Sequence, residues 1–398
     1  MISVEEAEAR ILQSFTPVGQ EWVTLDRAQD RVLAADLAAQ RTQPPSPVSA
    51  MDGYAVRAQD TAAQKKLDVI GEIPAGQSFD KPIGTGEAVR IFTGAPLPEN
   101  SDAILIQENV RRREDVITYE TAIEAGRYVR EAGLDFKQGW VGLRRGSILG
   151  PQALGLAATL GHFWLPVRRR PRIGLIATGD ELAWPGTTPA VHQHVSSNTT
   201  TLAAMCRRWG AETVDLGIAK DTIRSLRDAT ANLHGLDLLV TTGGASVGEY
   251  DLVRSAFEDQ QLQLDFWRIA MRPGKPLMFG QLRGVPTLGL PGNPVSASVC
   301  ALVFLRPIVA KLLDRQLTIL KKSARISAQL GPNDERKDFL RAKLNRLDGE
   351  IWAETAPRQD SSMFATFAHA DALVVRPPHD GKKSVGDSIA IVEIHDLL

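Results

Sequence analysis

The stretch LDLLVTTGGASVGEYD, residues 236–251, decides the fold of this chain. Its first five residues form a mostly apolar run that predicts a buried strand. The run passes directly into a loop with two adjacent glycines, Gly243 and Gly244, and an apolar segment at 252–257 predicts the start of a helix. A strand, a glycine loop and a helix in this order are typical of an α/β unit that binds an anion at the end of the strand.

The glycines have a physical reason at this position. Glycine adopts positive φ without strain, so Gly243 and Gly244 allow backbone N–H groups to converge on an anion. The hydroxyl groups of Thr242 and Ser246 add two donors. A tight turn alone would also require glycine, but the position before a helix favours phosphate or nucleotide binding. The loop is neither a Walker A loop nor a GxGxxG fingerprint, which argues against kinases and dehydrogenases.

Strand and helix patterns alternate on both sides of this loop. This alternation predicts a parallel, doubly wound sheet in an α/β domain of residues 171–318. The predicted strands are 173–177, 213–218, 236–240, 264–269, 277–279 and 287–290, and the predicted helices are 201–209, 223–233 and 295–312, with a further helix beginning at 252.

The regions on either side of this α/β domain have a different pattern of apolar residues. Between Met51 and Phe136, short apolar runs separated by Gly and Pro predict a small β domain, which we place at 46–137. We expect that it is inserted into a discontinuous, helical N-terminal domain formed by 1–45 and 138–170. Short strand-like runs return near Lys321, so residues 319–398 predict a second β domain at the C-terminus, similar to a β-barrel.

Composition excludes several classes of protein. The chain has 398 residues and a net charge of −1, so no basic excess indicates binding to nucleic acid. Cys206 and Cys300 lie in apolar runs, which indicates buried thiols in a reducing compartment. The N-terminus is not a signal peptide, and no uninterrupted apolar run is long enough for a membrane span. We therefore expect a cytoplasmic protein without membrane contact.

Acidic residues follow several predicted strands. Glu181, Asp221, Glu249 and Asp251 all lie where a parallel sheet collects its ligand-binding loops. Any one of them could simply cap a helix or solvate a loop. As a group they favour Mg²⁺ with a phosphorylated ligand, because hard cations prefer carboxylate oxygens. His192 and His194 have no further Cys or His at metal-binding spacing, so we interpret them as surface residues.

Two further segments could contact the same ligand. Asn293 and Pro294 have the residue types of a helix N-cap and first turn, which explains them structurally and also directs a second helix N-terminus toward the crevice. Arg268, Arg272 and Lys275 form a basic stretch around a Pro-Gly pair, and they predict either an anion site or a solvated surface. By physical criteria alone, Asp52-Gly53 and Thr93-Gly94 are ordinary turns.

Six motifs occur in order along the chain: SAMDGYAVR (49–57), FTGAP (92–96), TGDEL (178–182), GGASVG (243–248), PGKP (273–276) and LPGNPVS (290–296). Each is short, but the set is highly specific and spans nearly the whole chain. With these motifs the chain resembles the molybdopterin molybdenumtransferase family, the MoeA proteins, which includes the E domain of gephyrin.

The resemblance implies an activity and a quaternary structure. Family members are homodimers of elongated four-domain subunits. They convert adenylylated molybdopterin and molybdate into molybdenum cofactor and AMP, with a divalent cation such as Mg²⁺. The resemblance also implies, as partners, a molybdopterin adenylyltransferase and apo-molybdoenzymes that receive the cofactor.

The resemblance also implies roles for particular residues. Asp52 and Thr93 would act at the site of the neighbouring subunit, and Asp135 would match a family Gly-x-Asp turn. Glu181, Asp221 and Asp251 would be the catalytic acids and metal ligands, while Arg272 and Lys275 would face phosphate or molybdate. The remaining expected substrate contacts are Thr242, Gly243, Gly244, Ser246, Arg268, Pro291, Asn293, Pro294 and Ser361.

The sequence departs from the family pattern at three places. Arg268 and Arg272 stand where lysines are usual, which keeps the charge but changes geometry and bulk. Ser196-Ser197-Asn198 has Ser where Asp or Asn is usual, and 359–362 is a loose version of the C-terminal motif. Two other functions stay open at this point: a molybdopterin adenylyltransferase, and a scaffold that binds a partner peptide in the manner of gephyrin.

Overall fold

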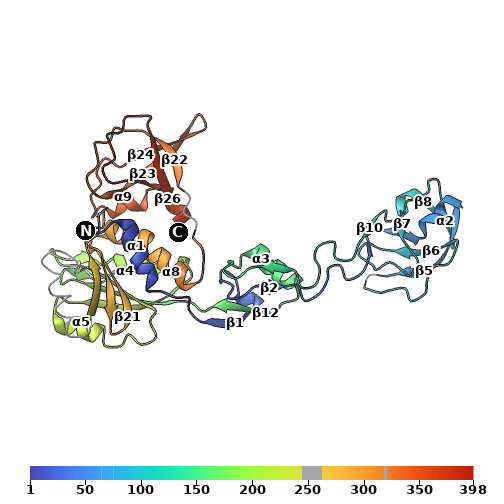
Figure 1. Cartoon of the computed structure of the whole chain (residues 1–398), viewed down its shortest axis with the longest axis horizontal. Helices are drawn as coiled ribbons and strands as arrows, with labels where there is room; N and C mark the ends of the chain where they lie inside the picture. Colours follow the sequence, from blue (N-terminus) through green and yellow to red (C-terminus); the bar gives the residue numbers. More distant parts are fainter. Residues whose placement is uncertain (64, 75, 244–261, 318–320, 398) are drawn as a thin grey trace.

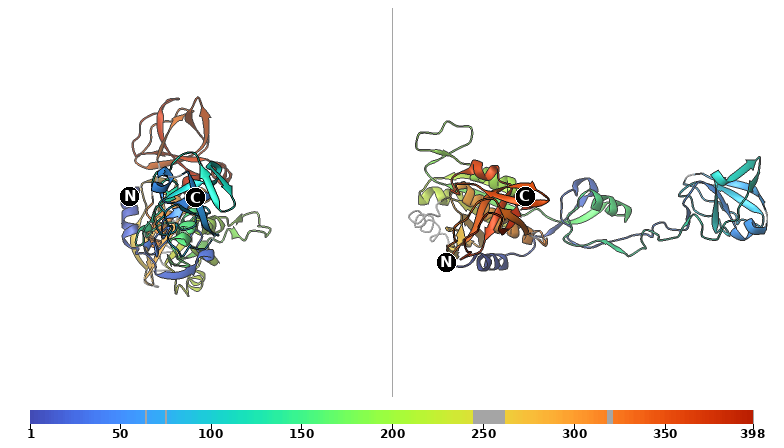
Figure 2. Two further views of the ribbon diagram at one scale, coloured as in Figure 1. Left: turned by 90° about the vertical axis from the view of Figure 1, so that its right-hand side faces the viewer. Right: turned by 90° about the horizontal axis from the view of Figure 1, so that it is seen from above.

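The computed structural model describes residues 1–63, 65–74, 76–243, 262–317 and 321–397. The subunit is elongated, with a small β module at one end and two larger bodies side by side at the other (Figure 1). A smaller part that contains α3 (Pro151–Thr159) lies between them, and two chain segments connect it to the β module (Figure 1). The view from above shows the same separation (Figure 2). Both termini lie at the end that contains the central sheet.

The central domain is a six-stranded sheet in the order β16-β13-β17-β21-β20-β18. β13, β16, β17 and β21 are parallel, as the alternating pattern predicts, but β20 and β18 are antiparallel. Only Arg283 and Gly284 connect β20 to β21, both with positive φ, and so short a link allows only an antiparallel hairpin. The strands are β13 (Arg172–Thr178), β16 (Glu212–Ala219), β17 (Leu238–Thr242), β18 (Leu262–Trp267), β20 (Met278–Leu282) and β21 (Val285–Leu290).

Helices cover this sheet: α4 (Asn198–Arg208), α5 (Ile223–Ala229), α7 (Pro294–Cys300) and α8 (Arg306–Leu312), with a π-helical turn, η3 (Ala301–Leu305), between the last two. Residues 294–312 form a helix long and apolar enough to cross a membrane, but 89% of its most apolar window is buried inside the fold. Its composition is therefore that of a core helix. Cys206 and Cys300 are buried free thiols, as predicted.

The inserted module is a six-stranded sheet, as the Gly- and Pro-punctuated pattern predicts. Its order is β7-β4-β6-β5-β9-β8. A short ladder between β3 (Val48–Ser49) and β10 (Val129–Arg130) closes its base. The module contains β4 (Gly53–Val56), α2 (Ala58–Ala63), β5 (Lys66–Ile73), β6 (Glu87–Ile91), β7 (Ala103–Ile106), η2 (Gln107–Asn109), β8 (Val110–Arg113) and β9 (Val116–Tyr119).

The middle of the subunit consists of paired short strands around one helix, α3 (Pro151–Thr159), so it is less helical than the sequence suggests. Its ladders join β1 (Gln20–Thr24) to β12 (Trp164–Arg168), and β2 (Leu37–Ala38) to β11 (Val141–Leu143), with η1 (Leu25–Arg27) after β1.

The first helix, α1 (Val4–Gln13), packs elsewhere. Ser3 caps it as predicted, since its hydroxyl accepts from the Glu6 N–H at 3.0 Å. Its apolar face, including Ile11, belongs to the core formed by η3 and α8 of the central domain, although the sequence groups residues 1–45 with 138–170. The domain boundaries stay a prediction.

The C-terminal region is a closed barrel, as expected. Its strands follow the order β23-β24-β22-β26-β25, and β25 pairs back onto β23. The elements are β22 (Lys322–Ile326), β23 (Lys337–Leu347), β24 (Glu350–Thr355), α9 (Phe364–Ala368), β25 (Ala372–Arg376), β26 (Ser388–Glu393) and α10 (Ile394–Leu397). A two-residue strand of the central domain, β19 (Met271–Arg272), pairs with the start of β23.

Candidate active site

A cavity of about 820 Å³ lies between the central sheet and the C-terminal barrel. The ends of β13, β17 and β21 form one side, and residues 359–362 of the barrel form another. This is the carboxyl edge of the parallel strands, where ligands bind in open α/β sheets. The structure brings together nine of the residues predicted from the sequence: Glu181, Thr242, Gly243, Arg272, Lys275, Pro291, Asn293, Pro294 and Ser361.

The end of β17 forms a tightly packed corner of the cavity. Gly243 has a φ of +94°, and a Cβ atom there would lie 2.2 Å from the carbonyl oxygen of Thr178. Only glycine fits this position, because both the dihedral and the space exclude a side chain. The Thr242 hydroxyl donates to the carbonyl of Pro291 at 3.2 Å, which joins the loops after β17 and β21.

Asn198 is a site residue that was not assigned a role of its own from the sequence. Its Nδ2 donates to the Thr242 hydroxyl at 2.6 Å and to the Gly292 carbonyl at 2.7 Å. Because it begins α4, it ties that helix to both strand-end loops. The signal in the sequence was its position in the Ser-Ser-Asn segment before the predicted helix.

Two buried hydroxyl groups face the cavity without a hydrogen-bond partner in the described part of the chain. They belong to Thr178, which is 2% exposed, and Ser196, which is 4% exposed. Buried polar groups are normally satisfied, since an unpaired one costs about 1–3 kcal/mol. A polar ligand in this cavity would supply the missing partners.

Acidic side chains gather beside the loop after β13, where Glu181 lines the cavity but Asp180 and the predicted site residue Asp221 do not. Burial raises the pKa of Asp221, and the nearby charges of Asp180 and Glu181 raise it further. The Asp221 N–H donates to Asp180 at 3.4 Å, and Glu181 lines the cavity. Like charges held together in this way favour a cation. Among the described residues, no three His, Cys, Asp or Glu side chains form a complete metal site, and Asp251 lies outside them.

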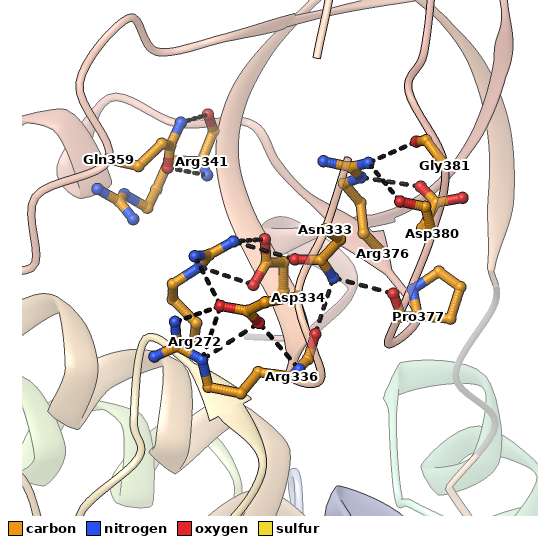
Figure 3. A network of polar contacts seen from close by, with 11 residues as sticks. Arg272, Asn333, Asp334, Arg336, Arg341, Gln359, Arg376, Pro377, Asp380 and Gly381 are labelled. Carbon is orange, nitrogen blue, oxygen red and sulfur yellow. Dashed lines mark hydrogen bonds and ion pairs between the residues drawn. The ribbon is translucent and has the colours of Figure 1, made fainter. Parts of the chain in front are cut away.

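Three cationic side chains line the cavity, but two of them are held by carboxylates. Arg272 binds Asp338 and Asp334, and Arg336 binds Asp334 (Figure 3). Lys275 has no ionic partner within the described ranges. Arg336 is a second residue that the sequence did not single out, because nothing local marks its approach to the cavity.

Several predicted site residues lie elsewhere. Arg268 does not line the cavity, and its guanidinium stacks 3.7 Å from the centre of the Trp267 ring. Asp135 also lies away from it, in the chain segment near Gln43, whose carbonyl accepts from the Asp135 N–H at 3.1 Å. Gly244, Ser246 and Asp251 fall outside the described residues.

Asp52 and Thr93 meet one another in the β module. One Asp52 carboxylate oxygen accepts from both the backbone N–H and the hydroxyl of Thr93, each at 2.8 Å. These hydrogen bonds, the backbone one first, lower the pKa of Asp52. Within one subunit the module lies at the opposite end from the cavity (Figure 1), so the pair does not reach the cavity of its own chain.

A cavity at the carboxyl edge of an α/β sheet, bordered by a C-terminal barrel, in a chain that also carries a distant β module, defines a multidomain protein that binds a small polar ligand. Family models match three successive parts of the chain. They are the MoeA N-terminal region (domain I and II) at 2–161, the probable molybdopterin binding domain at 174–311 and the MoeA C-terminal region (domain IV) at 323–394.

Relatives cover the full length. A molybdopterin molybdenumtransferase of Haemophilus influenzae is 33% identical over 100% of both chains. Molybdopterin molybdenumtransferase 2 of Mycobacterium tuberculosis is 35% identical over 99% of this chain and 100% of its own. A crystal structure of the molybdopterin biosynthesis MoeA protein of Pyrococcus horikoshii is 30% identical, with a TM-score of 0.88 over 99% of each chain. The chain therefore belongs to the MoeA family of molybdopterin molybdenumtransferases.

Proposed function

We propose that this protein is a molybdopterin molybdenumtransferase, an enzyme that inserts molybdate into adenylylated molybdopterin and releases AMP. The observation that carries the proposal is the cavity itself. It combines two buried, unpartnered hydroxyl groups, Thr178 and Ser196, with the unpaired ammonium of Lys275 among the described residues. Hydroxyl donors beside a cation suit a ligand with phosphate or oxyanion groups. Full-length similarity to proteins of this name supports the same substrates.

The chain's own residues act mainly by holding charge. Lys275 would stabilise negative charge on the phosphoanhydride or on molybdate, since a fixed cation in a partly dry site requires no reorganisation during the reaction. Asn198 and Gly243 keep the corner at the end of β17 rigid, which fixes the orientation of the bound pterin phosphate. Pro291, Asn293 and Pro294 shape the adjoining wall.

A divalent cation, Mg²⁺, suits the acidic group beside the cavity. Glu181 and Asp221, with Asp251, would hold it, and the pKa of Asp221, raised by burial and by the charges of Asp180 and Glu181, supports a cation there. When bound, the ion would withdraw charge from the bridging oxygen of the phosphoanhydride.

We further propose that the active protein is a homodimer in which Asp52 and Thr93 serve the cavity of the partner. Their separation from the cavity within one elongated subunit supports this arrangement (Figure 1). A cytoplasmic location is proposed from the composition and the two buried cysteines. Exchange of ligands with a molybdopterin adenylyltransferase and apo-molybdoenzymes is proposed from the family resemblance.

The test is release of AMP from adenylylated molybdopterin in the presence of Mg²⁺, measured with and without molybdate. We expect AMP only when molybdate is present. Formation of adenylylated molybdopterin from molybdopterin and ATP would instead indicate an adenylyltransferase. Ligand binding without any turnover would indicate a scaffold.

A further inference from the structure

The C-terminal barrel and the α/β domain share a strand pairing beside the cavity. β19 of the α/β domain runs parallel to β23 of the barrel, and the register places Arg272 directly opposite Asp338. The Lys337 N–H donates to the Ala270 carbonyl at 3.0 Å in the same joint. Arg272 therefore stands at the boundary between the two domains.

The Arg272 guanidinium uses most of its donors on the barrel. Its Nε donates to one carboxylate oxygen of Asp338 at 2.8 Å. Its Nη2 donates to the other carboxylate oxygen of Asp338, and it also donates to the side-chain oxygen of Asn333 at 3.0 Å. Its Nη1 lies 3.3 Å from Asp334. Figure 3 shows Asn333 and Asp334 beside Arg272. Four of its five N–H groups are thus engaged.

Asp338 depends on this contact. It is 1% exposed, and both of its carboxylate oxygens accept from Arg272. A buried carboxylate without its partner is strongly unfavourable. A lysine at position 272 would preserve the charge, but it could not form the two-pronged contact because its ammonium is a point charge.

Strand β23 also supports a second connection between the barrel and the α/β domain beside the cavity. Arg341 lies three residues after Asp338 in β23. Its backbone N–H donates to the Gln359 side chain at 2.9 Å, and its guanidinium donates to the Asp360 carbonyl at 2.9 Å. This holds the loop that presents Ser361. The Asn293 side chain then donates to the Ser361 hydroxyl at 2.8 Å, back on the α/β domain.

We propose that Arg272 is a positioning residue that locks β23 onto the α/β domain, and so sets Arg336 and Ser361 at the cavity, instead of binding the substrate anion itself. The charges around Arg272 support this role, because the two positive charges of Arg272 and Arg336 are balanced by the two negative charges of Asp334 and Asp338. That balance leaves Lys275 for the anion. The role differs from the one implied by the family resemblance. Only the predicted effects of this positioning role on kcat/KM rest on the proposed function.

The two possible roles of Arg272 predict opposite results for two conservative variants. If Arg272 positions β23, Arg272→Lys and Asp338→Asn both loosen the joint, and each lowers kcat/KM by up to about a hundredfold, the scale of loss that a displacement of site groups by about 1 Å can cause. If Arg272 binds the anion, Arg272→Lys stays close to wild type, because lysine also binds anions. Asp338→Asn then raises kcat/KM for molybdate, because it frees the guanidinium.

A readout independent of turnover separates this inference from the proposed function. We expect faster hydrogen exchange of the backbone amides in 337–341 and 359–362 in both variants, whether or not the chain transfers molybdenum. The matched controls are Arg325→Lys and Glu350→Gln, which break an exposed Arg–carboxylate pair elsewhere on the barrel and should change neither segment.

Unchanged exchange at the joint in both variants would overturn the proposal, as would increased molybdate turnover in Asp338→Asn. If Asp338→Asn does not fold, Arg272→Lys decides alone, because a lysine variant with wild-type exchange and kinetics is incompatible with a positioning role.

Discussion

Gly243 is the residue at which β17 turns into the cavity, and its surroundings leave no room for substitution. In Gly243→Ala, the new methyl group would lie 2.2 Å from the Thr178 carbonyl oxygen, in a backbone conformation with φ of +94°. We expect the free energy of unfolding to fall by about 2 kcal/mol or more, since strain and overpacking both contribute. Urea denaturation measures this loss. Gly331→Ala, where nothing lies within 4 Å, is the matched control. Equal stability of the two variants would contradict the geometry at β17.

For a substitution at Asp221 we expect the free energy of unfolding to rise, in contrast to Gly243→Ala. The folded-state pKa of Asp221 is raised, first by burial and then by Asp180 and Glu181, so folding disfavours its ionised form. Asp221→Asn removes that cost at neutral pH, and we expect it to stabilise the metal-free protein, by less than about 1 kcal/mol at so accessible a position.

If Mg²⁺ binds these carboxylates as proposed, the same variant should lose part of the stabilisation that the ion gives to wild type, because one ligand is missing. Thermal unfolding with EDTA and with Mg²⁺ measures both effects. Asp228→Asn, on the exposed face of α5 nearby, should behave as wild type. A less stable metal-free Asp221→Asn protein, or an undiminished response to Mg²⁺, would argue against an acidic metal site.

The sequence predicted the site residues that follow strands, because position after a strand is a local property. Glu181, Gly243 and Asn293 could be placed in this way. Asn198 and Arg336 could not, since their roles depend on contacts with residues far along the chain. Arg272 shows the limit most clearly. Its charge suggested an anion site, but its partner Asp338 lies 66 residues away and no spacing pattern links them.

The loop before β23 contributes Asp334 to the carboxylate network around Arg272. Asp334 accepts from Arg336 through both the side chain and the backbone, and these bonds lower its pKa to about 2 from 3.8. A depressed folded-state pKa means that the ionised group stabilises the fold above pH 3.8, and that this contribution is lost as the pH falls from 3.8 to about 2.

We therefore expect Asp334→Asn to be less stable than wild type at neutral pH, with a difference that shrinks across that acidic range. Urea unfolding at a series of pH values tests this expectation. A stability difference that stays constant down to pH 2 would show that the loss comes from packing and not from the charge.

Helices and strands were predicted best where the spacing of apolar residues and the length of the segment indicate the same type of element, as in the core helix 294–312 and in β17. The antiparallel pairing of β20 and β21 was missed because the pattern of a short apolar run does not show direction. The two-residue Arg283-Gly284 connection carries that information. The sequence groups helix α1 with residues 138–170 by their composition, whereas its apolar face packs on η3 and α8.

The elongated subunit separates residues that the family resemblance places in one reaction. Asp52 and Thr93 are at one end, and the cavity with Lys275 is at the other (Figure 1). No sequence property of an ordinary Asp-Gly turn indicates action at a distance. If the β module serves the partner, a dimer has two cavities, and each combines Lys275 of one chain with Asp52 of the other.

This arrangement can be tested by mixing two inactive variants, Asp52→Ala and Lys275→Ala. In a mixed dimer, one cavity carries both defects, while the other combines the intact Lys275 of the first chain with the intact Asp52 of the second. When subunits reassort at random, half of the dimers are mixed and each has one intact cavity, so about a quarter of wild-type AMP release should return. Each variant refolded alone is the control. If Asp52 acted within its own chain, every cavity in the mixture would lack one group, and no activity would return at any mixing ratio.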